Sequence, residues 1–201
     1  MTGLWIAVGV LAVLLVGGLV GGFLLLAMGR LHLDLDWGRS FHDLGPIEVQ
    51  IGAPRDLLFE MISEPYLGHT PRHGGIEVLS RGKDLAVAVH HTKIHFYTAR
   101  TVEAVKFEPP SRIGFTHLAG PVPHAVEEFL LEEADDVTKL GYSGEVGIDF
   151  YFLGRLAARH WVRPQWERAV REDLEDLKQR AEQLAARRRS RWSHQVTPPA
   201  L

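Results

Sequence analysis

The sequence predicts an α+β fold in which a curved antiparallel sheet of about seven strands wraps around a long C-terminal helix, behind one transmembrane helix. Three observations predict it. Residues 3–28 are uncharged and almost all apolar, short alternating segments separated by turn residues fill most of 46–149, and an apolar stripe runs through the C-terminal third. A curved sheet cannot bury its concave face alone, and the C-terminal stripe is long enough to cover it.

Composition sets the size and class of the protein. The chain has 201 residues, of which 46% are hydrophobic and 23% charged, which is room for one ordinary domain and an appendage. A net charge of −3 argues against nucleic-acid binding through bulk charge. Cysteine is absent from the sequence, which excludes disulfides, thiolate metal sites and thiol catalysis. We expect no nucleic-acid partner, no cofactor and no metal.

The N-terminal segment 1–29 is predicted to be a retained transmembrane anchor. At about 1.5 Å per residue, the apolar run 3–28 is longer than the roughly 30 Å hydrocarbon core of a bilayer. A cleaved signal peptide, the alternative, would have a basic start and an apolar stretch of only about 7–15 residues. Arg30 and Arg39 follow the span, so the positive-inside rule predicts a single-pass protein with its soluble domain in the cytoplasm.

Glycine pairs inside the span suggest self-association. Gly17 with Gly21, and Gly18 with Gly22, form two overlapping small-xxx-small pairs, which let two helix backbones approach closely in lipid. The sequence therefore allows a homodimer through these four glycines. The alternative is the ordinary glycine content of spanning helices.

Residues 30–45 are predicted to link the membrane to the domain. His32, Asp34 and Asp36 alternate with leucines, so an extended strand would place them on one face. Such a spacing rarely converges on a single metal ion, and a half-exposed strand explains it better. Trp37 is expected to contact the membrane interface, where tryptophans are enriched.

The domain itself is predicted over residues 46–189. Ile47, Val49 and Ile51 alternate as in a strand, and Pro54 then starts a helix with Asp56 in its first turn. A Pro- and Gly-rich break over 63–75 leaves room for a second short helix. Six strands are expected to follow, at residues 76–81, 85–94, 95–106, 112–118, 125–133 and 138–149.

The C-terminal element is predicted to be a long helix. Its apolar stripe consists of Leu156, Trp166, Val170, Leu174, Leu177, Ala181 and Leu184. Pro164 should kink or break it. The helix is expected to end in Arg187, Arg188, Arg189 and Arg191, and residues 190–201 are expected to be a disordered basic and Pro-containing tail. Close to a bilayer these arginines would contact anionic lipid; the alternative is a basic helix end that suits the helix dipole.

Three segments resemble the SRPBCC superfamily, which includes START-like lipid-transfer, polyketide cyclase/dehydrase and pollen-allergen-like domains. They are IEVQIGAPRDLLFEMI (47–62), FEPPSRIGF (107–115) and LEDLKQRAEQ (174–183), and the resemblance covers roughly 46–186. It implies the helix-grip fold, with a cavity between the sheet and the C-terminal helix.

A cavity at that place would be lined by inward-facing aromatic and polar residues. We expect Tyr97, Phe115, His117, Tyr142, His160 and Trp166 to contact a ligand. Such a lining is mostly apolar with a few polar groups, which suits a hydrophobic small molecule or lipid. The alternative is that these aromatic side chains simply fill the core.

Other polar residues are interpreted as surface groups. His90, His91 and His95 are expected to be exposed strand histidines, since adjacent strand residues point to opposite faces. Glu127 and Glu128 likewise fall on opposite faces, and the acidic stretch 127–136 is predicted to be a solvated hairpin.

The sequence thus predicts a membrane-anchored domain that binds a hydrophobic small molecule or lipid. Two alternatives stay open. One is a polyketide cyclase/aromatase-like enzyme, for which Tyr142, His117 and His160 are the positions to test, and the other is a membrane-tethered protein-interaction module. No set of residues forms a catalytic motif, so no catalytic residue is assigned.

Overall fold

A computed structural model describes residues 2–68, 72–73, 75–94, 97–135 and 137–195. The helical elements are α1 (Thr2–Ala27), α2 (Arg55–Leu67), α3 (Tyr151–Ala157), the π-helical turn η1 (Ala158–Val162) and α4 (Arg163–Gln195). The strands are β1 (Ser40–Ile51), β2 (Arg72–His73), β3 (Ile76–Arg81), β4 (Leu85–Ile94), β5 (Tyr97–Glu108), β6 (Arg112–Ala119), β7 (His124–Ala134) and β8 (Val137–Ile148).

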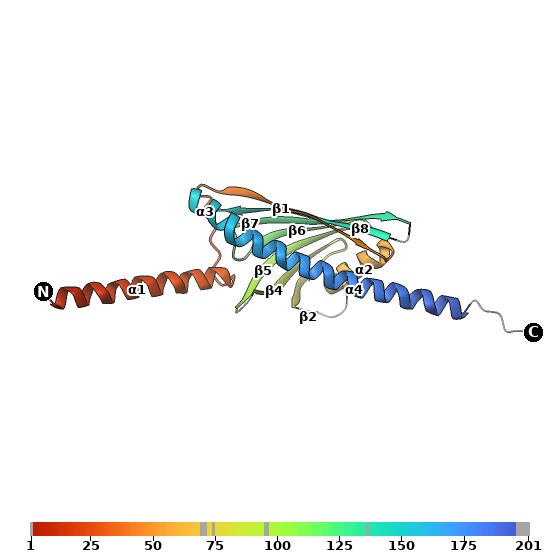
Figure 1. Cartoon of the computed structure of the whole chain (residues 1–201), viewed down its shortest axis with the longest axis horizontal. Coiled ribbons are helices and arrows are strands. Elements are labelled where there is room, and N and C mark those ends of the chain that lie inside the picture. Colours follow the sequence, from red (N-terminus) through yellow and green to blue (C-terminus); the bar gives the residue numbers. More distant parts are fainter. Residues whose placement is uncertain (1, 69–71, 74, 95–96, 136, 196–201) are drawn as a thin grey trace, which may run out of the picture.

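The strands form one antiparallel sheet that curves around the C-terminal helix. Its order is β1-β8-β7-β6-β5-β4-β3-β2, so each strand after β2 pairs with the next along the chain and β1 closes the far edge against β8. Figure 1 shows α4 running across the sheet, with α1 projecting from one end of the molecule. The predicted α+β architecture, a curved antiparallel sheet on a long C-terminal helix, is confirmed.

The core lies where α4 and α2 cover the sheet. On α4 the buried residues are Leu174, Leu177, Ala181 and Ala185, which recur at helical spacing. They belong to one hydrophobic cluster with Ile51, Leu58, Phe107 and Leu140 from the sheet and α2. The part of α4 before Leu174 packs less tightly, since Trp166 and Val170 are only partly buried, as is Val162 of η1.

Several element boundaries differ from the predicted ones. Strand β1 begins at Ser40, inside the expected linker, because Ser40–Leu44 pair with Gly144–Ile148 of β8. The expected second short helix is replaced, in the described residues of that break, by the two-residue strand β2. Helix α4 continues to Gln195, so residues 190–195 are helical and only 196–201 of the predicted tail lie outside the described residues.

The helical region around Pro164 contains a change of helix type. Residues 158–162 form a π-helical turn, in which the Arg163 N–H donates to the Ala158 carbonyl five residues back. Pro164 follows directly and has no backbone N–H to donate. The wider π-helical turn before it accommodates this break in the helical hydrogen bonding. The expected kink is thus a π-helical turn between α3 and α4.

Helix α1 stands away from the domain over most of its length. Residues 3–27 are apolar enough and long enough to cross a bilayer, and they are largely exposed. An added Cβ atom at Gly17, Gly18, Gly21 or Gly22 would meet nothing within 4 Å. The homodimer through these glycines therefore stays a prediction.

Candidate functional site

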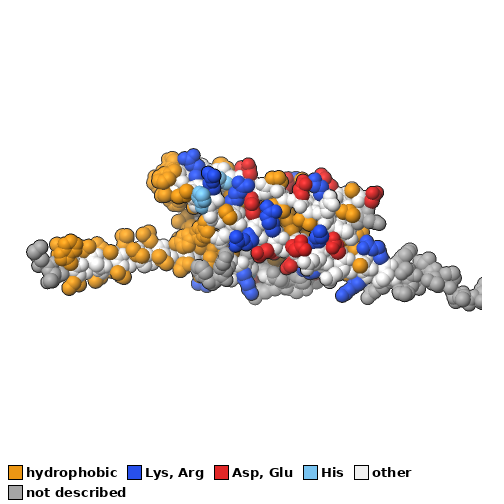
Figure 2. Space-filling view, viewed as in Figure 1, with side chains coloured by type: hydrophobic (Ala, Val, Ile, Leu, Met, Phe, Trp, Pro, Cys, Tyr) orange, Lys and Arg blue, Asp and Glu red, His pale blue; other side chains and the backbone are white. Residues whose placement is uncertain are grey.

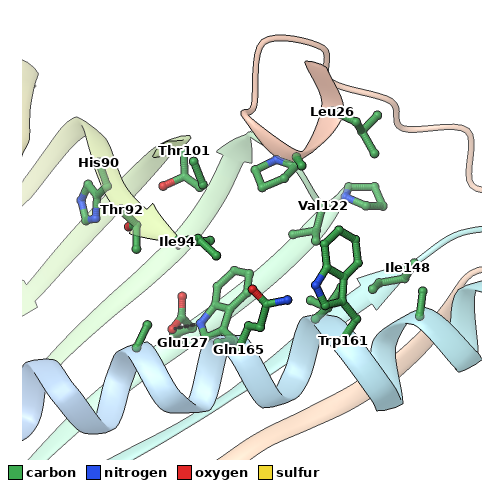
Figure 3. A pocket seen from close by; sticks show the side chains of 18 of the residues that line it. Leu26, His90, Thr92, Ile94, Thr101, Val122, Glu127, Ile148, Trp161 and Gln165 are labelled. Carbon is green, nitrogen blue, oxygen red and sulfur yellow. Dashed lines mark hydrogen bonds between the residues drawn. The ribbon is translucent and has the colours of Figure 1, made fainter. Parts of the chain in front are cut away.

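A cavity of about 570 Å³ lies between the concave face of the sheet and the N-terminal half of α4. Figure 3 shows side chains from the sheet, from the helix and from Leu26 at the end of α1 surrounding it. Its apolar walls include Phe23, Leu26, Leu33, Ile94, Tyr97, Ala99, Phe115, Val122, Phe129, Ile148, Leu153, Trp161, Val162, Trp166 and Val170. A chamber of this size and lining is suited to a small, largely apolar molecule.

A row of polar side chains crosses the concave face beneath these walls. The antiparallel register pairs His90 with Thr101 and Glu103 with His117, and it places Glu127 opposite Phe115. Because residues i and i+2 of a strand point to the same face, strands β4 to β7 deliver these groups to one side of the sheet. Tyr142 of β8 completes the row through Glu127.

Glu127 is held by two hydrogen bonds. The Tyr142 hydroxyl donates to its Oε2 at 2.6 Å, and the indole N–H of Trp166 in α4 donates to the same oxygen at 2.9 Å. Gly144 lies opposite Glu127 on β8, and a Cβ there would come within 3.0 Å of the Glu127 Cγ. The glycine therefore leaves space for the Glu127 side chain and for the Val126 carbonyl oxygen, which a Cβ would approach to 2.7 Å.

Glu103 forms a second polar centre beside two histidines. Its Oε1 accepts a hydrogen bond from the Thr101 hydroxyl at 2.7 Å. The His90 Nδ1 lies 3.4 Å from Oε2, and the His117 Nδ1 lies 4.0 Å from Oε1. The His90 Nε2 and both ring nitrogens of His117 are buried without a hydrogen-bond partner among the described residues.

Burial changes the protonation of this row. It raises the pKa of Glu127 to about 7, helped by the charge of Glu103, although the Tyr142 and Trp166 hydrogen bonds oppose the shift. Burial also raises the pKa of Glu103. It lowers the pKa of His90 and of His117 to about 4, so both imidazoles are neutral near pH 7. The floor of the cavity can therefore accept and donate protons near neutrality.

The open end of the cavity is formed by α1 and α3. Phe23 of α1 stacks on Trp161 of η1, with ring centroids 4.7 Å apart, and Leu26 and Ala27 line the cavity beside Leu153 of α3. The start of α3 is fixed by backbone bonds, since Phe150 and Tyr151 donate to the carbonyls of Trp37 and Gly38. The predicted membrane-spanning segment thus ends at the mouth of the cavity.

The structure brings some of the predicted ligand-binding residues together. Tyr97, Phe115 and Trp166 line the cavity. Tyr142 is 2% exposed and reaches the cavity floor through Glu127, and the His117 side chain is buried beside Glu103. His160 is exposed and lies outside the lining, because the π-helical turn places it on the outer side.

Several polar residues of the site were not predicted. His90 and Glu127, interpreted as surface groups, line the cavity, as does Glu103. The sequence feature that places Glu103 on the buried face is its i, i+2 spacing with Val105 and Phe107, since alternate residues of a strand share a face. Among the other surface assignments, His91 is exposed, and His95 lies outside the described residues.

The predicted membrane contacts lie at two different ends of the molecule. Trp37 is 58% exposed and packs against Phe150 and Tyr151 near the cavity mouth. Arg187, Arg188 and Arg189 lie near the C-terminal end of α4, which Figure 1 places at the opposite end from α1. The structure therefore does not bring these arginines next to the end of α1, and the side chain of Arg191 lies outside the described residues.

The linker residues form ion pairs instead of a polar strand face. Asp34 and Asp149 both pair with Arg39, the latter at 2.8 Å, and His32 contacts the Gly120 carbonyl at 3.1 Å through Nδ1. The Arg39 guanidinium holds the pKa of Asp149 below its ordinary value. These contacts fix the linker against the sheet beside the cavity mouth.

Solved structures with the same fold include an aromatase/cyclase and a synthase. The Zhui aromatase/cyclase of a Streptomyces species matches with a TM-score of 0.57 and 20% identity, over 72% of this chain and 94% of that one. A protein from Thermus thermophilus matches with a TM-score of 0.59 and 18% identity, over 72% and 99%. Norcoclaurine synthase from Thalictrum flavum matches with a TM-score of 0.53 and 13% identity, over 74% and 93%.

These similarities establish the fold. No protein-family model and no curated protein matches the sequence. At these identities the likeness shows the fold alone, a curved antiparallel sheet around a long C-terminal helix, which is the architecture that the sequence resemblance predicted.

Proposed function

We propose that this protein is a membrane-anchored helix-grip domain that binds a hydrophobic small molecule or lipid in its cavity. The observation that carries the proposal is the position of the cavity mouth. Phe23, Leu26 and Ala27, the last residues of the apolar helix α1, line the same chamber as Phe115 and Trp166. An apolar molecule could pass between a bilayer that holds α1 and this chamber without crossing water.

The surface around the mouth supports this arrangement. The exposed apolar residues of α3 and the loop before it are Phe150, Tyr151, Phe152, Leu153 and Leu156. Figure 2 shows hydrophobic side chains gathered on α1 and on the end of the domain that carries α3, whereas charged side chains cover the adjoining face. An exposed apolar patch of this kind suits contact with a membrane surface.

Chemical analysis of the purified protein tests ligand binding. The full chain, extracted in detergent, is examined by native mass spectrometry and by solvent extraction, and we expect one co-purifying apolar compound. Ala169→Trp, which places an indole in the cavity wall, should lose it while Glu172→Trp, at an exposed position of the same helix, should retain it. A wild-type protein that carries no apolar compound and binds none from added lipid extract would overturn the proposal.

The orientation proposed from the flanking arginines can be tested separately. The chain has no cysteine, so Asp135→Cys at the exposed β7–β8 turn gives a single thiol. For a domain in the cytoplasm, a membrane-impermeant maleimide should label it only after the cells are opened. Labelling in intact cells would place the domain outside.

A cyclase-like enzyme is the second candidate, and the titratable row favours it. Glu127, with a pKa of about 7, lies at a cavity floor where neutral His90 and Tyr142 could assist proton transfer. If the protein is an enzyme, the compound recovered from Glu127→Gln should be the substrate and should differ in mass or structure from that recovered from wild type. Recovery of the same compound from both proteins would favour a carrier.

A further inference from the structure

The side chains of the cavity lining that carry a charge when ionised near neutral pH are acidic, because burial keeps the His90 imidazole neutral. Glu103, Glu127, Asp149 and Asp173 carry carboxyl groups, and among the described residues of the lining there is no lysine or arginine. Asp149 is neutralised by Arg39 at 2.8 Å, and Asp173 lies at an exposed position of α4. Glu103 and Glu127 are the two carboxyl groups of the cavity floor.

These two floor carboxyl groups lack a permanent positive partner among the described residues. The contacts to Glu127 are the neutral Tyr142 hydroxyl and Trp166 indole, and the contacts to Glu103 are Thr101 and two imidazoles that burial keeps neutral. A buried carboxylate without a cation is costly, so each gains from a ligand that donates hydrogen bonds to it.

Buried histidine nitrogens that have no hydrogen-bond partner among the described residues lie near these carboxyl groups. The His90 Nε2 is buried and unpartnered on a side chain that lines the cavity. His117 has a side chain that is 1% exposed, and its two ring nitrogens are both unpartnered, with Nδ1 directed toward Glu103. Figure 3 shows His90, Thr101 and Glu127 on the side of the sheet that faces α4. Buried polar atoms are nearly always satisfied in folded proteins, so the unpartnered His90 Nε2 in the cavity lining marks the place of a polar ligand group, whereas His117 lies outside that lining.

We propose that the ligand is an amphiphile whose polar end is a protonated amine, seated between Glu103 and Glu127 with its apolar body directed toward the α1 mouth. This inference rests on the proposed function and specifies its ligand class. An ammonium group supplies three donors and the missing positive charge. A carboxylate or phosphate end would place a like charge beside two carboxyl groups, which is unfavourable in a desolvated site.

A matched series of amphiphiles tests the proposal. The full chain is placed in nanodiscs of phosphatidylcholine, which has no net charge, and dodecylamine, dodecanol and dodecanoate are added at equal mole fraction in the bilayer. Native mass spectrometry of the ejected protein then gives the occupancy of each. We expect dodecylamine to bind at least about tenfold more tightly than dodecanoate, with dodecanol between them.

Amino-acid substitutions test whether Glu103 and Glu127 cause the preference for the amine over the carboxylate. The double variant Glu103→Gln, Glu127→Gln keeps the side-chain shapes and should reduce the amine-to-carboxylate ratio to about threefold or less, with dodecanol binding unchanged. Glu128→Gln removes a charge from the opposite face of β7, where Glu128 pairs with Arg112 at 2.8 Å, and should keep the full ratio.

Two failures can be told apart. If dodecanoate binds as tightly as dodecylamine, or if the double variant keeps the wild-type ratio, the ligand class is wrong while the cavity still binds apolar molecules. If none of the three compounds binds, and Ala169→Trp behaves like the wild type, the proposed function fails and this inference fails with it.

Discussion

Glu127 illustrates how a single side chain can be misplaced by its neighbours in sequence. It stands in EEFLLEE, a stretch with the composition of a solvated strand, and Glu128 beside it does pair with Arg112 on the outer face. The alternation of a strand nevertheless turns Glu127 inward, where Tyr142 and Trp166 bind it. Composition alone could not show this, because the deciding contacts come from β8 and α4, distant in sequence.

The raised pKa of Glu127 predicts a pH-dependent stability. With a folded-state pKa of about 7 against the ordinary 4.5, the folded chain keeps a proton that the unfolded chain loses between those pH values. This contribution is fully present below about pH 4.5 and is lost as the pH rises through 7. Glu127→Gln, which stays neutral, should lie within about 1 kcal/mol of wild type at pH 5 and exceed its free energy of unfolding by on the order of 3 kcal/mol at pH 8.

Urea unfolding of the full chain in nanodiscs at pH 5 and pH 8 measures this difference. His90 and His117, with lowered pKa values, contribute in the opposite sense, because stability rises with pH as their unfolded forms lose protons between about pH 4 and 6.5. They are present in both proteins and cancel in the comparison. A variant whose advantage is the same at both pH values would show that Glu127 ionises normally.

At the scale of elements, the sequence predicted the strands better than it predicted the residues at which elements begin and end. The alternation that predicted 76–81 and 85–94 matches β3 and β4 as observed. Residues 40–45, in contrast, join β1 only through pairing with β8, and the π-helical turn arises from the meeting of Pro164 with α3. Both depend on partners far away in sequence or on tertiary packing, which local periodicity does not encode.

Leu174 is the residue of α4 expected to contribute most to stability. It is 2% exposed within the core cluster, so Leu174→Ala removes buried contacts and leaves a cavity. We expect it to lower the free energy of unfolding by about 2–5 kcal/mol. Glu175→Ala, at the next and exposed position, should change it by about 0.5 kcal/mol or less. Equal effects of the two substitutions would mean that α4 does not cover the sheet.

Helix α3 is expected to lie in the membrane interface. Phe152 is 65% exposed and lies in the element that forms the cavity mouth with α1. Phe152→Cys labelled with an environment-sensitive dye should show a blue-shifted emission in nanodiscs and should be quenched by lipids that carry a nitroxide near the headgroup. Labelled Glu172→Cys on α4 is the matched exposed site and should remain unquenched. Equal quenching at both sites would exclude a docked α3.

At the scale of the whole molecule, the apolar helix α1 and the cavity are joined at one place. The chain could have joined its apolar helix to the domain through a free linker, yet Arg100 N–H donates to the Met28 carbonyl at 3.1 Å and Arg39 ties the linker to Asp149. These contacts fix the end of α1 against the sheet at the mouth. The sequence predicted both parts but gave no sign of their junction, since no local pattern relates Phe23 to Trp161.

We expect the Phe23–Trp161 stack at that junction to act as a gate for exchange of the proposed ligand with the bilayer. The two ring centroids lie 4.7 Å apart, at the end of the cavity that α1 borders. Phe23→Ala opens this contact without altering the floor, so transfer of a fluorescent dodecylamine from the protein to acceptor vesicles should accelerate severalfold, while its equilibrium occupancy should change by less than about threefold. Leu14→Ala, at an exposed position farther along α1, is the control and should leave the rate unchanged. If Phe23→Ala exchanges at the wild-type rate, the ligand enters by another route, and α1 serves only to hold the domain at the membrane.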